Sequence, residues 1–544
     1  MDNDLNTQII SPNDAPSVLL RDYTVKPLFQ KRGIDLIVTA ALVLLSITGV
    51  SAVFWNYLSL GYTLVFSAAF VLISLFVFKK AQKINIPFLI CGILSLVCSC
   101  SYFLTSNAAV KILTFLATIV SSVIWFSSAA GKEYSRGDYN LLVYAFTAVY
   151  RAGSDLPRVL KSIFSKSESK SKTVSNILIG VACSIPVVLI VVPLLINADE
   201  AFSALMSGII DDYFSLAQKV FSGLVISIGL AALVFSLKYN DEQYKDYKLT
   251  AKINNATVSA FLGVLCLVYI VYLFSQLAYF FSAFSSILPK GYKFTYAAYA
   301  RRGFFELCII AFINLIMIYA AIIFSDKKEG GIPLAVKLPS IFIVLFTFVT
   351  IVTSISKMVM YIGAYGCTVL RIGTSAFMIW MFIFFIGILI RLFVKKFDVL
   401  VPGLILALVI LAVLGIFNIN AKIAEYNYNA YKTGKLKIDV NYMADLGDEG
   451  IPYLYKLTKD KDADTSNCAK AELSLKYYNY YDFGEKMTED IKTYKEFSKL
   501  EKSQNNLGAY SVVKSKAYEI FDKYAKEQNG NIYTEYEYDD TADQ

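Results

Sequence analysis

Histidine is absent from the 544-residue chain, and charged residues make up only 17% of it. The lack of histidine excludes Ser-His and Cys-His nucleophile pairs, zinc sites that contain histidine, and any histidine pH switch. The chain also contains no Gly-x-x-x-x-Gly-Lys-Ser/Thr loop and no Gly-x-Ser-x-Gly turn, which argues against a P-loop nucleotidase and an α/β-hydrolase. Soluble globular proteins average about one quarter charged residues, so this composition indicates a membrane protein.

Cysteine is present at eight positions, seven of which lie in or beside hydrophobic runs. This distribution is not typical of a disulfide framework. Cys98 and Cys100 form a Cys-x-Cys pair inside a predicted membrane helix, where small packing residues are far more common than metal ligands. The sequence therefore predicts no metal site and no cofactor.

Long apolar runs dominate the first 418 residues. Eleven of them approach the roughly 20 residues that a helix needs to cross an apolar layer of about 30 Å. Their approximate limits are 34–54, 58–78, 86–104, 112–130, 174–196, 221–237, 258–281, 303–324, 338–356, 374–394 and 399–417. The runs are continuously apolar instead of alternating, which indicates helices. We therefore expect an all-α, polytopic helical membrane protein with about eleven transmembrane helices.

Basic residues alternate between successive loops. Residues 1–33 are polar, lack the short apolar core of a cleavable signal, and end in Lys31 and Arg32 before the first span, which predicts a cytoplasmic N-terminal segment. With this start, the loops predicted inside hold about three times as many Lys and Arg residues as those predicted outside. The loop that ends in Arg301 and Arg302 blurs the alternation. Eleven crossings then place the C-terminus outside the cell membrane.

Net charge divides the chain into two parts. Residues 1–418 carry 33 basic and 20 acidic side chains, whereas residues 419–544 carry 18 and 23. We expect residues 34–418 to form the transmembrane bundle. In the tail, apolar and aromatic residues recur at helical spacing near 451–455, 473–477 and 491–497, which predicts a small, mostly helical extracytoplasmic domain over 419–544.

One acidic run in the tail resembles the start of a calcium-binding loop. Asp460, Asp462 and Asp464 alternate, but Thr465 and Ala471 stand where such a loop requires Gly and Glu. A solvated acidic turn is therefore favoured over a calcium site.

Two connections are expected to form amphipathic helices. In segment 138–173, apolar residues recur at helical spacing among basic residues from Arg151 to Lys172, which predicts a cytoplasmic interfacial segment that binds anionic lipid. Each basic group near anionic lipid contributes about 1 kcal/mol, so lipid adhesion explains this segment, and a protein-docking site is the alternative. Segment 199–220 has a second apolar stripe with its acidic residues off that stripe, and we expect it on the outer membrane surface or capping the bundle.

The alternation of inside and outside loops also predicts that a set of polar residues, distant in sequence, lies at the outer membrane interface. The set is Asp199, Glu200, Gln276, Tyr299, Arg301, Arg302, Glu306, Asn314, Lys357 and Arg371. An ionisable residue facing lipid costs several kcal/mol, so Glu306 and Lys357 are expected to have partners. One interpretation is a polar vestibule that binds an anionic head group or solute through its cations, with a carboxylate as proton carrier or acid and base. The other is a set of interhelical ion pairs near the head groups.

The run Thr295-Tyr-Ala-Ala-Tyr-Ala-Arg-Arg-Gly-Phe-Phe-Glu-Leu307 resembles the signature of a bacterial membrane family catalogued as domains of unknown function 4153 and 4173. Other matching pieces are Asn197-Ala-Asp-Glu-Ala-Phe202, Tyr361-Ile-Gly-Ala-Tyr-Gly366 and Leu446-Gly-Asp-Glu-Gly-Ile-Pro452. The resemblance implies a multi-pass bacterial membrane protein with an outward C-terminal domain, and it supplies no activity.

Three classes of function remain open. A transporter of an anionic or amphipathic envelope compound fits the many spans, although no paired interrupted helices support it. A sensor or envelope-assembly factor would bind an envelope partner through its tyrosine-rich tail, since Tyr is favoured at interfaces. A membrane-embedded transferase acting on lipid-linked precursors would need a metal or a carboxylate with a shifted pKa. We expect sensing, assembly or transport in preference to catalysis, and no nucleic-acid partner.

Overall fold

The computed structural model describes residues 26–54, 59–79, 84–164, 210–244, 252–284, 304–327, 331–480 and 511–527, apart from single positions inside these ranges. Within this part, nine helices are long and apolar enough to span a membrane. A tenth candidate is α15 (Leu400–Ile416), which meets α16 (Ile419–Lys432) at an angle of 57°. These helices confirm the all-α polytopic fold.

The spanning helices of the described part coincide with predicted apolar runs. They are α1 (Gly33–Phe54), α2 (Leu60–Val77), α3 (Ile86–Ser99) with its continuation α4 (Ser101–Leu104), α5 (Ala108–Ala129), α9 (Ile210–Tyr239), α10 (Asn255–Phe284), α12 (Phe304–Phe324), α13 (Leu334–Tyr365) and α14 (Val369–Phe393). With α15, ten of the eleven predicted runs have a described helix. The predicted span 174–196 lies outside the described residues.

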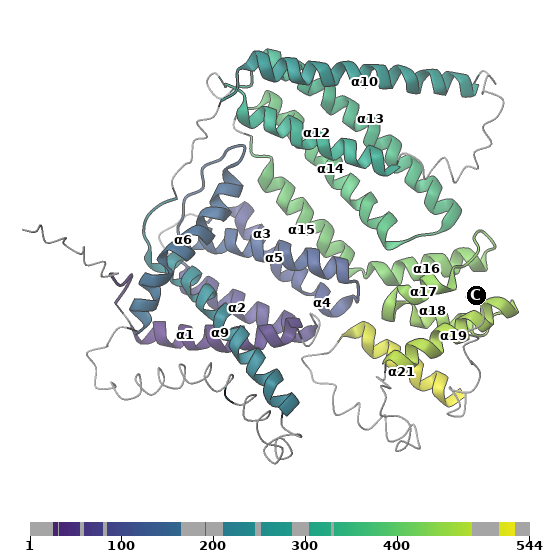
Figure 1. Ribbon diagram of the computed structural model, residues 1–544, viewed down its shortest axis with the longest axis horizontal. Coiled ribbons are helices and arrows are strands. Elements are labelled where there is room, and N and C mark those ends of the chain that lie inside the picture. The colour runs from purple at the N-terminus through teal and green to yellow at the C-terminus, as the bar shows by residue number, and fades with distance from the viewer. Residues whose placement is uncertain are drawn as a thin grey trace, which may run out of the picture.

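The helices form two groups with α15 between them (Figure 1). One group contains α1, α2, α5 and α9, and Leu42 and Phe235 are fully buried in its core. The other group contains α10, α12, α13 and α14, with Ile343 and Phe385 fully buried. α15 packs the fully buried Leu408 against α3. Each group thus has its own apolar core, and α15 joins the two.

Large apolar side chains stay exposed on the outer faces of the spanning helices. On α5, Ile112 and Leu116 are more than half exposed, whereas Thr114 and Thr118 on the opposite face are fully buried. Exposed apolar surface costs about 25 cal/mol per Å² in water, so this surface needs an apolar surrounding. In a bilayer, lipid covers the apolar face and the small polar residues turn toward neighbouring helices.

One end of the bundle is covered by α6 (Asn140–Phe164), and we name it the α6 end. Here Lys79, after α2, pairs with Asp241, after α9, at an Nζ–Oδ1 distance of 2.8 Å. Asp138, before α6, pairs with Lys327, after α12. The ends of α2 and α9 therefore lie side by side, and the end of α12 lies beside the start of α6.

The opposite end carries α16, and we name it the α16 end. α15 breaks into α16 at Asn418, which has a left-handed backbone conformation with φ of 50° and caps α16 by accepting from the N–H of Ala421. Its Nδ2 also donates to the carbonyl oxygen of Leu104 at 2.8 Å. Asn107 caps α5 and donates to Oδ1 of Asn420 at 2.7 Å. These asparagines hold α16 across the ends of α4 and α5.

Residues 419–480 and 511–527 form a cluster of short helices at the α16 end, which we name the C-terminal region. Its elements are α16, α17 (Val440–Asp445), η1 (Gly447–Glu449), α18 (Ile451–Leu457), α19 (Ala463–Tyr480) and α21 (Val512–Glu527). Leu454, Leu473 and Phe521 are fully buried in their shared core. Cys367, between α13 and α14, joins the same core, so the region packs on the bundle. The predicted helix near 491–497 lies outside the described residues.

Three elements differ from their predicted limits. α13 continues to Tyr365, so Lys357 lies inside a helix instead of at its end. Of the predicted outer amphipathic helix 199–220, the described residues 210–220 form the first part of α9, which begins at Ile210. The described part of segment 138–173 is the single helix α6, with Pro157 inside it. Apolar periodicity marks the buried face of a helix but not its ends, which explains these differences.

Candidate functional site

The structure does not bring the predicted vestibule residues together at one site among the residues it describes. Five of them lie outside the described residues: Asp199, Glu200, Tyr299, Arg301 and Arg302. Gln276 belongs to α10, but its side chain also lies outside the description. The remaining four, Glu306, Asn314, Lys357 and Arg371, occupy three separate places.

Glu306, Lys357 and Asn314 make contacts between helices. Glu306 is exposed in the first turn of α12 and acts electrostatically on the half-buried Lys357 of α13. Asn314 is fully buried, accepts from the Tyr269 hydroxyl of α10 at 2.5 Å and donates to Thr347 of α13 at 2.9 Å. A buried amide is costly unless it is hydrogen-bonded, so Asn314 joins three helices. Glu306 and Lys357 thus face each other from α12 and α13, and Asn314 links α12 to α10 and α13.

Arg371 begins α14 and closes the turn that follows α13. Its Nη1 donates to the carbonyl oxygens of Tyr365 at 3.1 Å and Gly366 at 2.5 Å, and its guanidinium lies 4.2 Å from the ring centroid of Tyr361. Gly366 has φ of 80°, a conformation that glycine adopts without strain. The arginine is thereby fixed by its own turn.

The same turn is bonded to the C-terminal region. Asn427 of α16 accepts from the backbone N–H of Cys367 at 2.7 Å and donates to its carbonyl at 2.9 Å. The hydroxyl of Tyr442 in α17 accepts from the N–H of Val369 at 2.8 Å. Burial raises the pKa of the Cys367 thiol, so this cysteine packs as a neutral group and is not a reactive thiolate.

A cavity of about 580 Å³ opens between this turn and the C-terminal region, and we name it the α16-end cavity. Its polar lining includes Arg371, Asn427, Lys435, Lys437, Asp439 and Tyr442. Asp439 already caps α17 by accepting from the N–H of Tyr442 at 2.9 Å. Three cationic side chains thus face the cavity with one engaged carboxylate, which makes it electropositive. Arg371 is the predicted vestibule residue that lines it.

Glu449 joins the C-terminal region to the loop between α4 and α5. It is only 3% exposed and accepts from the Thr105 hydroxyl at 3.1 Å, from the Ser106 N–H at 2.7 Å and from the Ser106 hydroxyl. Gly447 has φ of 75°, and a Cβ there would lie 2.8 Å from Ser106 Oγ. We name Glu449, Thr105, Ser106 and Gly447 the Glu449 clasp. The piece Leu446–Pro452 carries part of the family resemblance, but its sequence does not indicate this contact.

Asp448 lies beside the clasp among lysines. Burial raises its pKa to about 6, the neighbouring Glu449 acts in the same direction, and Lys514, Lys111 and Lys476 oppose the shift. These lysines come from α21, α5 and α19, so three elements face this carboxyl group. A carboxyl group whose pKa is shifted by burial and by specific charged neighbours is a candidate for a functional site.

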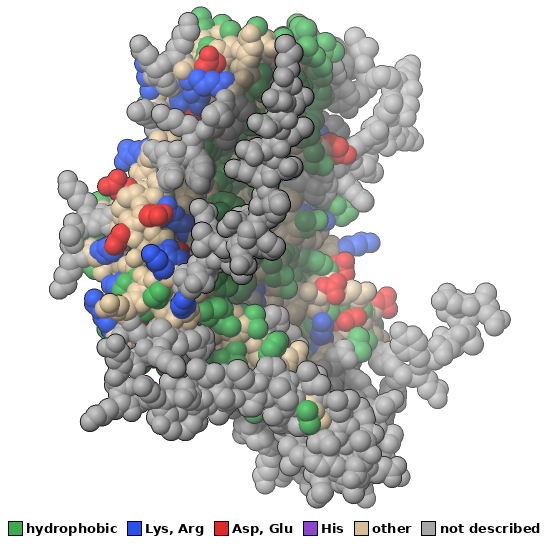
Figure 2. All heavy atoms as spheres, turned by 60° about the vertical axis from the view of Figure 1, so that its left-hand side comes forward, with side chains coloured by type: hydrophobic (Ala, Val, Ile, Leu, Met, Phe, Trp, Pro, Cys, Tyr) green, Lys and Arg blue, Asp and Glu red, His purple; other side chains and the backbone are tan. Residues whose placement is uncertain are grey.

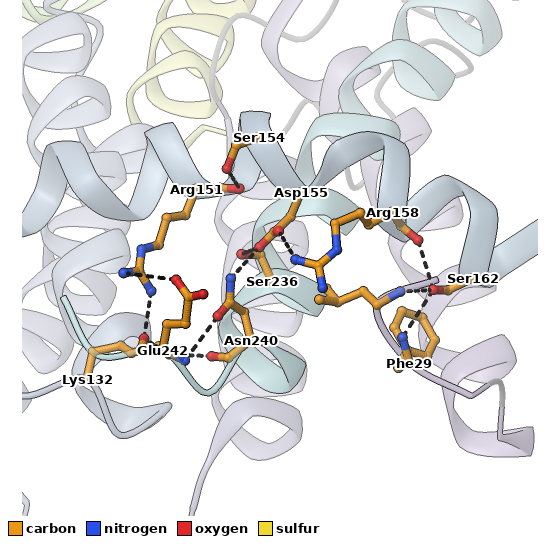
Figure 3. A network of polar contacts seen from close by, with 11 residues as sticks. Phe29, Lys132, Arg151, Ser154, Asp155, Arg158, Ser162, Ser236, Asn240 and Glu242 are labelled. Atoms are coloured by element: carbon orange, nitrogen blue, oxygen red, sulfur yellow. Dashed lines mark hydrogen bonds and ion pairs between the residues drawn. The ribbon is translucent and has the colours of Figure 1, made fainter. Parts of the chain in front are cut away.

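Asp155 of α6 is the centre of a buried polar network at the α6 end (Figure 3). It is 3% exposed and accepts from Arg158 at 3.0 Å, from Ser236 at 2.7 Å and from Asn240 at 2.8 Å. Ser162, two turns further along α6, accepts from the backbone N–H groups of residues 28 and 29 at 2.8 and 3.2 Å. α6 thus packs its polar face against α9 and the chain before α1.

Arg151, which begins the segment predicted to bind anionic lipid, contacts protein in the structure. It donates to the carbonyl oxygens of Glu242 at 2.6 Å and Gln243 at 2.8 Å, and its guanidinium lies 5.1 Å from the ring centroid of Tyr244. Lys161 is exposed, and the basic residues after it lie outside the described part. Figure 2 shows Lys and Arg side chains interspersed with Asp and Glu beside a hydrophobic surface.

Asp138 forms a second buried network at the α6 end that sequence analysis missed. It is 7% exposed and pairs with Arg391 of α14 and with Lys327, while the Tyr319 hydroxyl of α12 donates to its carbonyl. The signal in the sequence is Arg391, which stands inside the predicted span 374–394. A charge inside a span requires a partner, and this rule predicts that one exists without identifying it.

The acidic run that resembles a calcium loop caps a helix. Asp460 accepts from the Tyr431 hydroxyl at 3.2 Å and pairs with Lys432. Asp462 accepts from the N–H of Thr465 at 3.3 Å, in the first turn of α19. These carboxylates have protein partners, which favours the turn over the calcium site.

The fold and these contacts define a polytopic helical membrane protein with a helical region docked at one end of its bundle. Residues 92–457 match DUF4153, a domain of unknown function. Because the match covers more than half of the chain, the protein belongs to this family, which confirms the resemblance found in the sequence. No curated protein and no solved structure shows significant similarity to it.

Proposed function

We propose that the protein binds an anionic ligand in the α16-end cavity and that the C-terminal region responds to this ligand. The observation that carries the proposal is the composition of the cavity wall. Arg371 comes from the bundle, whereas Lys435 and Lys437 come from the C-terminal region. A bound anion would therefore contact both parts at once and stabilise their docked arrangement.

The chemistry of the lining favours a phosphate or carboxylate group. A guanidinium presents five N–H donors in a fixed fork that matches such groups, and the carbonyl contacts of Arg371 orient this fork. Lys435 and Lys437 are exposed and supply flexible donors at the rim. Two sources carry this chemistry, the head group of an anionic lipid and a soluble anionic compound.

The direct bonds between the α13–α14 turn and the C-terminal region support sensing or assembly over transport. Asn427 binds the backbone of Cys367 on both sides, and Tyr442 binds the N–H of Val369. A change at the cavity is therefore transmitted through short hydrogen bonds to α16 and α17. A transporter would instead need the ligand to continue through the bundle.

The surplus of Lys and Arg at the α6 end supports a cytoplasmic position for that end of the bundle in a bacterial cell membrane. The α16 end and its cavity then face the cell envelope, and the C-terminal region is where an envelope partner binds. On α6, Leu142, Phe146 and Val149 are exposed in the first half of the helix and Lys161 is exposed near its end, which supports a position in the plane of the cytoplasmic leaflet with anionic lipid near Lys161.

Lipid retention and phosphate titration test the cavity. The full-length protein is purified in detergent, and bound phosphatidylglycerol is counted by native mass spectrometry. Binding of a soluble anion is measured from the rise of the thermal unfolding midpoint with the concentration of inorganic phosphate. In Lys435→Ala/Lys437→Ala, we expect about tenfold weaker binding, since two charge-assisted contacts of about 0.7 kcal/mol each are lost. Lys461→Ala, an exposed lysine outside the cavity, is the matched control. Equal binding by the two variants with both ligands contradicts the proposal.

One observation favours a transferase acting on lipid-linked precursors as a second candidate. Asp448, with its pKa near 6 and three lysines around it, has the properties of a general acid or base beside a phosphate site. Product formation from a lipid-linked phosphate substrate that disappears in Asp448→Asn supports this candidate. Activity that persists in that variant removes it.

A further inference from the structure

The buried face of α5 is polar along most of its length. Lys111, Thr114, Thr118, Ser121 and Ser122 follow one another at intervals that place them on one side of the helix. Thr114, Thr118 and Ser121 are fully buried, and Ser122 is 5% exposed. Small residues such as Ser and Thr allow helices to pack closely. Close packing explains why these residues are small, but it does not show whether their hydroxyl groups are hydrogen-bonded.

Two hydroxyls on this face have no hydrogen-bond partner among the described residues, Thr114 Oγ1 and Ser122 Oγ. Their neighbours do have partners. Thr118 donates to a backbone carbonyl at 2.9 Å and lies 3.2 Å from the hydroxyl of Tyr102, and Ser121 donates to a backbone carbonyl at 2.8 Å. An unpaired buried hydroxyl costs roughly 1–3 kcal/mol, and bound water removes that cost.

The spacing of the hydroxyls fits short chains of bridging waters. Thr114, Thr118 and Ser122 are each four residues apart, which corresponds to a rise of about 6 Å per step. One water molecule that makes two hydrogen bonds of about 2.8 Å at its near-tetrahedral angle joins oxygens about 4.5 Å apart, so about two water molecules bridge each step. Thr118 can accept a further bond because a hydroxyl has one donor and two acceptor sites.

Polar groups end the series on one side and an aromatic ring ends it on the other. Toward the α16 end, Lys111 lies one turn before Thr114 and interacts with Asp448 and Glu449. Toward the α6 end, Trp125 donates to Ser74 at 3.0 Å and packs so tightly on α3 that a Cβ on Gly92 would lie 2.9 Å from its ring. The row of polar side chains on α5 therefore continues to charged groups at the α16 end and stops at the ring of Trp125.

We propose that the buried face of α5 binds a file of water molecules that runs from the Asp448–Lys111 cluster to Ser122. The file lets water and protons enter the bundle from the α16 end as far as Trp125. This site is independent of the α16-end cavity and of the ligand proposed for it.

Radiolytic labelling in water enriched in oxygen-18 tests the proposal. X-rays generate hydroxyl radicals from bound water, and these radicals oxidise the side chains beside it. In the full-length protein in nanodiscs, we expect oxygen-18 on Tyr102, which is fully buried and bonds to Thr118. Phe235, equally buried in the core of α9, is the internal control and stays unlabelled. Equal labelling of Tyr102 and Phe235 overturns the proposal.

A substitution distinguishes a hydrated hydroxyl from a dry one. Thr114→Val keeps the shape of the side chain and removes its hydroxyl. With bound water, the variant loses water contacts, lowers the thermal unfolding midpoint and reduces the labelling of Tyr102 at least threefold. Without it, the variant removes an unpaired polar group and raises the midpoint, which overturns the proposal. Thr353→Val, whose hydroxyl donates to the Val349 carbonyl at 2.8 Å, is the matched control, and Ser122→Ala repeats the test should Thr114→Val fail to fold.

Discussion

Glu449→Ala should release the C-terminal region from the bundle. The substitution removes the acceptor of three hydrogen bonds and leaves the Ser106 N–H and the hydroxyls of Thr105 and Ser106 without their partner. Hydrogen bonds to a charged acceptor contribute about 1.5–3 kcal/mol each, and water recovers part of this at the edge of the bundle. We therefore expect the free energy of docking to fall by about 3–5 kcal/mol, because three donors lose their acceptor. Glu449→Gln keeps the shape and one acceptor oxygen, so it should lose about half as much.

Limited proteolysis of the full-length protein in nanodiscs measures this release. In the docked protein the backbone near residues 446–452 is protected, and in Glu449→Ala cleavage there should accelerate at least 100-fold, the factor that about 3 kcal/mol implies. Glu425→Gln is the matched control, because the side chain of Glu425 is about half exposed and pairs with Lys422 at 2.9 Å on the surface of α16. Equal cleavage rates in Glu449→Ala and Glu425→Gln would refute the clasp.

Other consequences follow from buried groups. Asp138→Asn leaves Arg391 buried without its carboxylate and should lower the free energy of unfolding by about 3–5 kcal/mol in thermal or denaturant scans; an unchanged midpoint contradicts the network. Asp448 keeps its proton in the folded protein up to a pKa of about 6 but loses it near 3.8 when unfolded. The contribution of Asp448 to stability should therefore be largest below pH 4, fall as the pH rises to about 6 and then level off, so the difference in stability between the wild type and Asp448→Asn should change over this pH range and stay constant above it. Gly450→Ala places a Cβ on the carbonyl of Met443 and should reduce the thermal midpoint, whereas an unaltered midpoint means that the α17–α18 turn is looser than described.

The spans were predictable because length and hydropathy decide them together. α12 begins at Phe304 against a predicted limit of 303, since polar residues precede it and apolar residues fill it. α13 was harder to delimit, because Lys357 looks like a stop signal. The long aliphatic stem of a lysine can lie along a helix surface while its ammonium reaches polar groups, so the helix continues to Tyr365.

The contacts of the candidate site could not be predicted from the sequence, for a different reason. Glu449 and Ser106 are more than 300 residues apart, and periodicity indicates which face of a helix is buried without naming its partner. Asp155 illustrates the same limit, because the sequence shows only an acid among basic residues. The structure shows that this acid is the buried acceptor that holds α6 on α9.

Gly447 and Asn418 show which signals a sequence can supply for such contacts. Each stands between two helical runs and adopts a positive φ, and Gly and Asn are the residues that favour this conformation. The sequence thus marks both positions as points where the chain changes direction. Only the structure shows that both bring polar groups to the end of α4 and the loop that follows it.

The most direct test of this account is the side of the membrane that the α16-end cavity faces. Lys437→Cys, at the rim of the cavity, and Lys161→Cys, on α6, are treated in intact cells with a membrane-impermeant thiol reagent. The account predicts that the cysteine at position 437 is labelled in intact cells and that the cysteine at position 161 is labelled only after permeabilisation. The reverse pattern would contradict it.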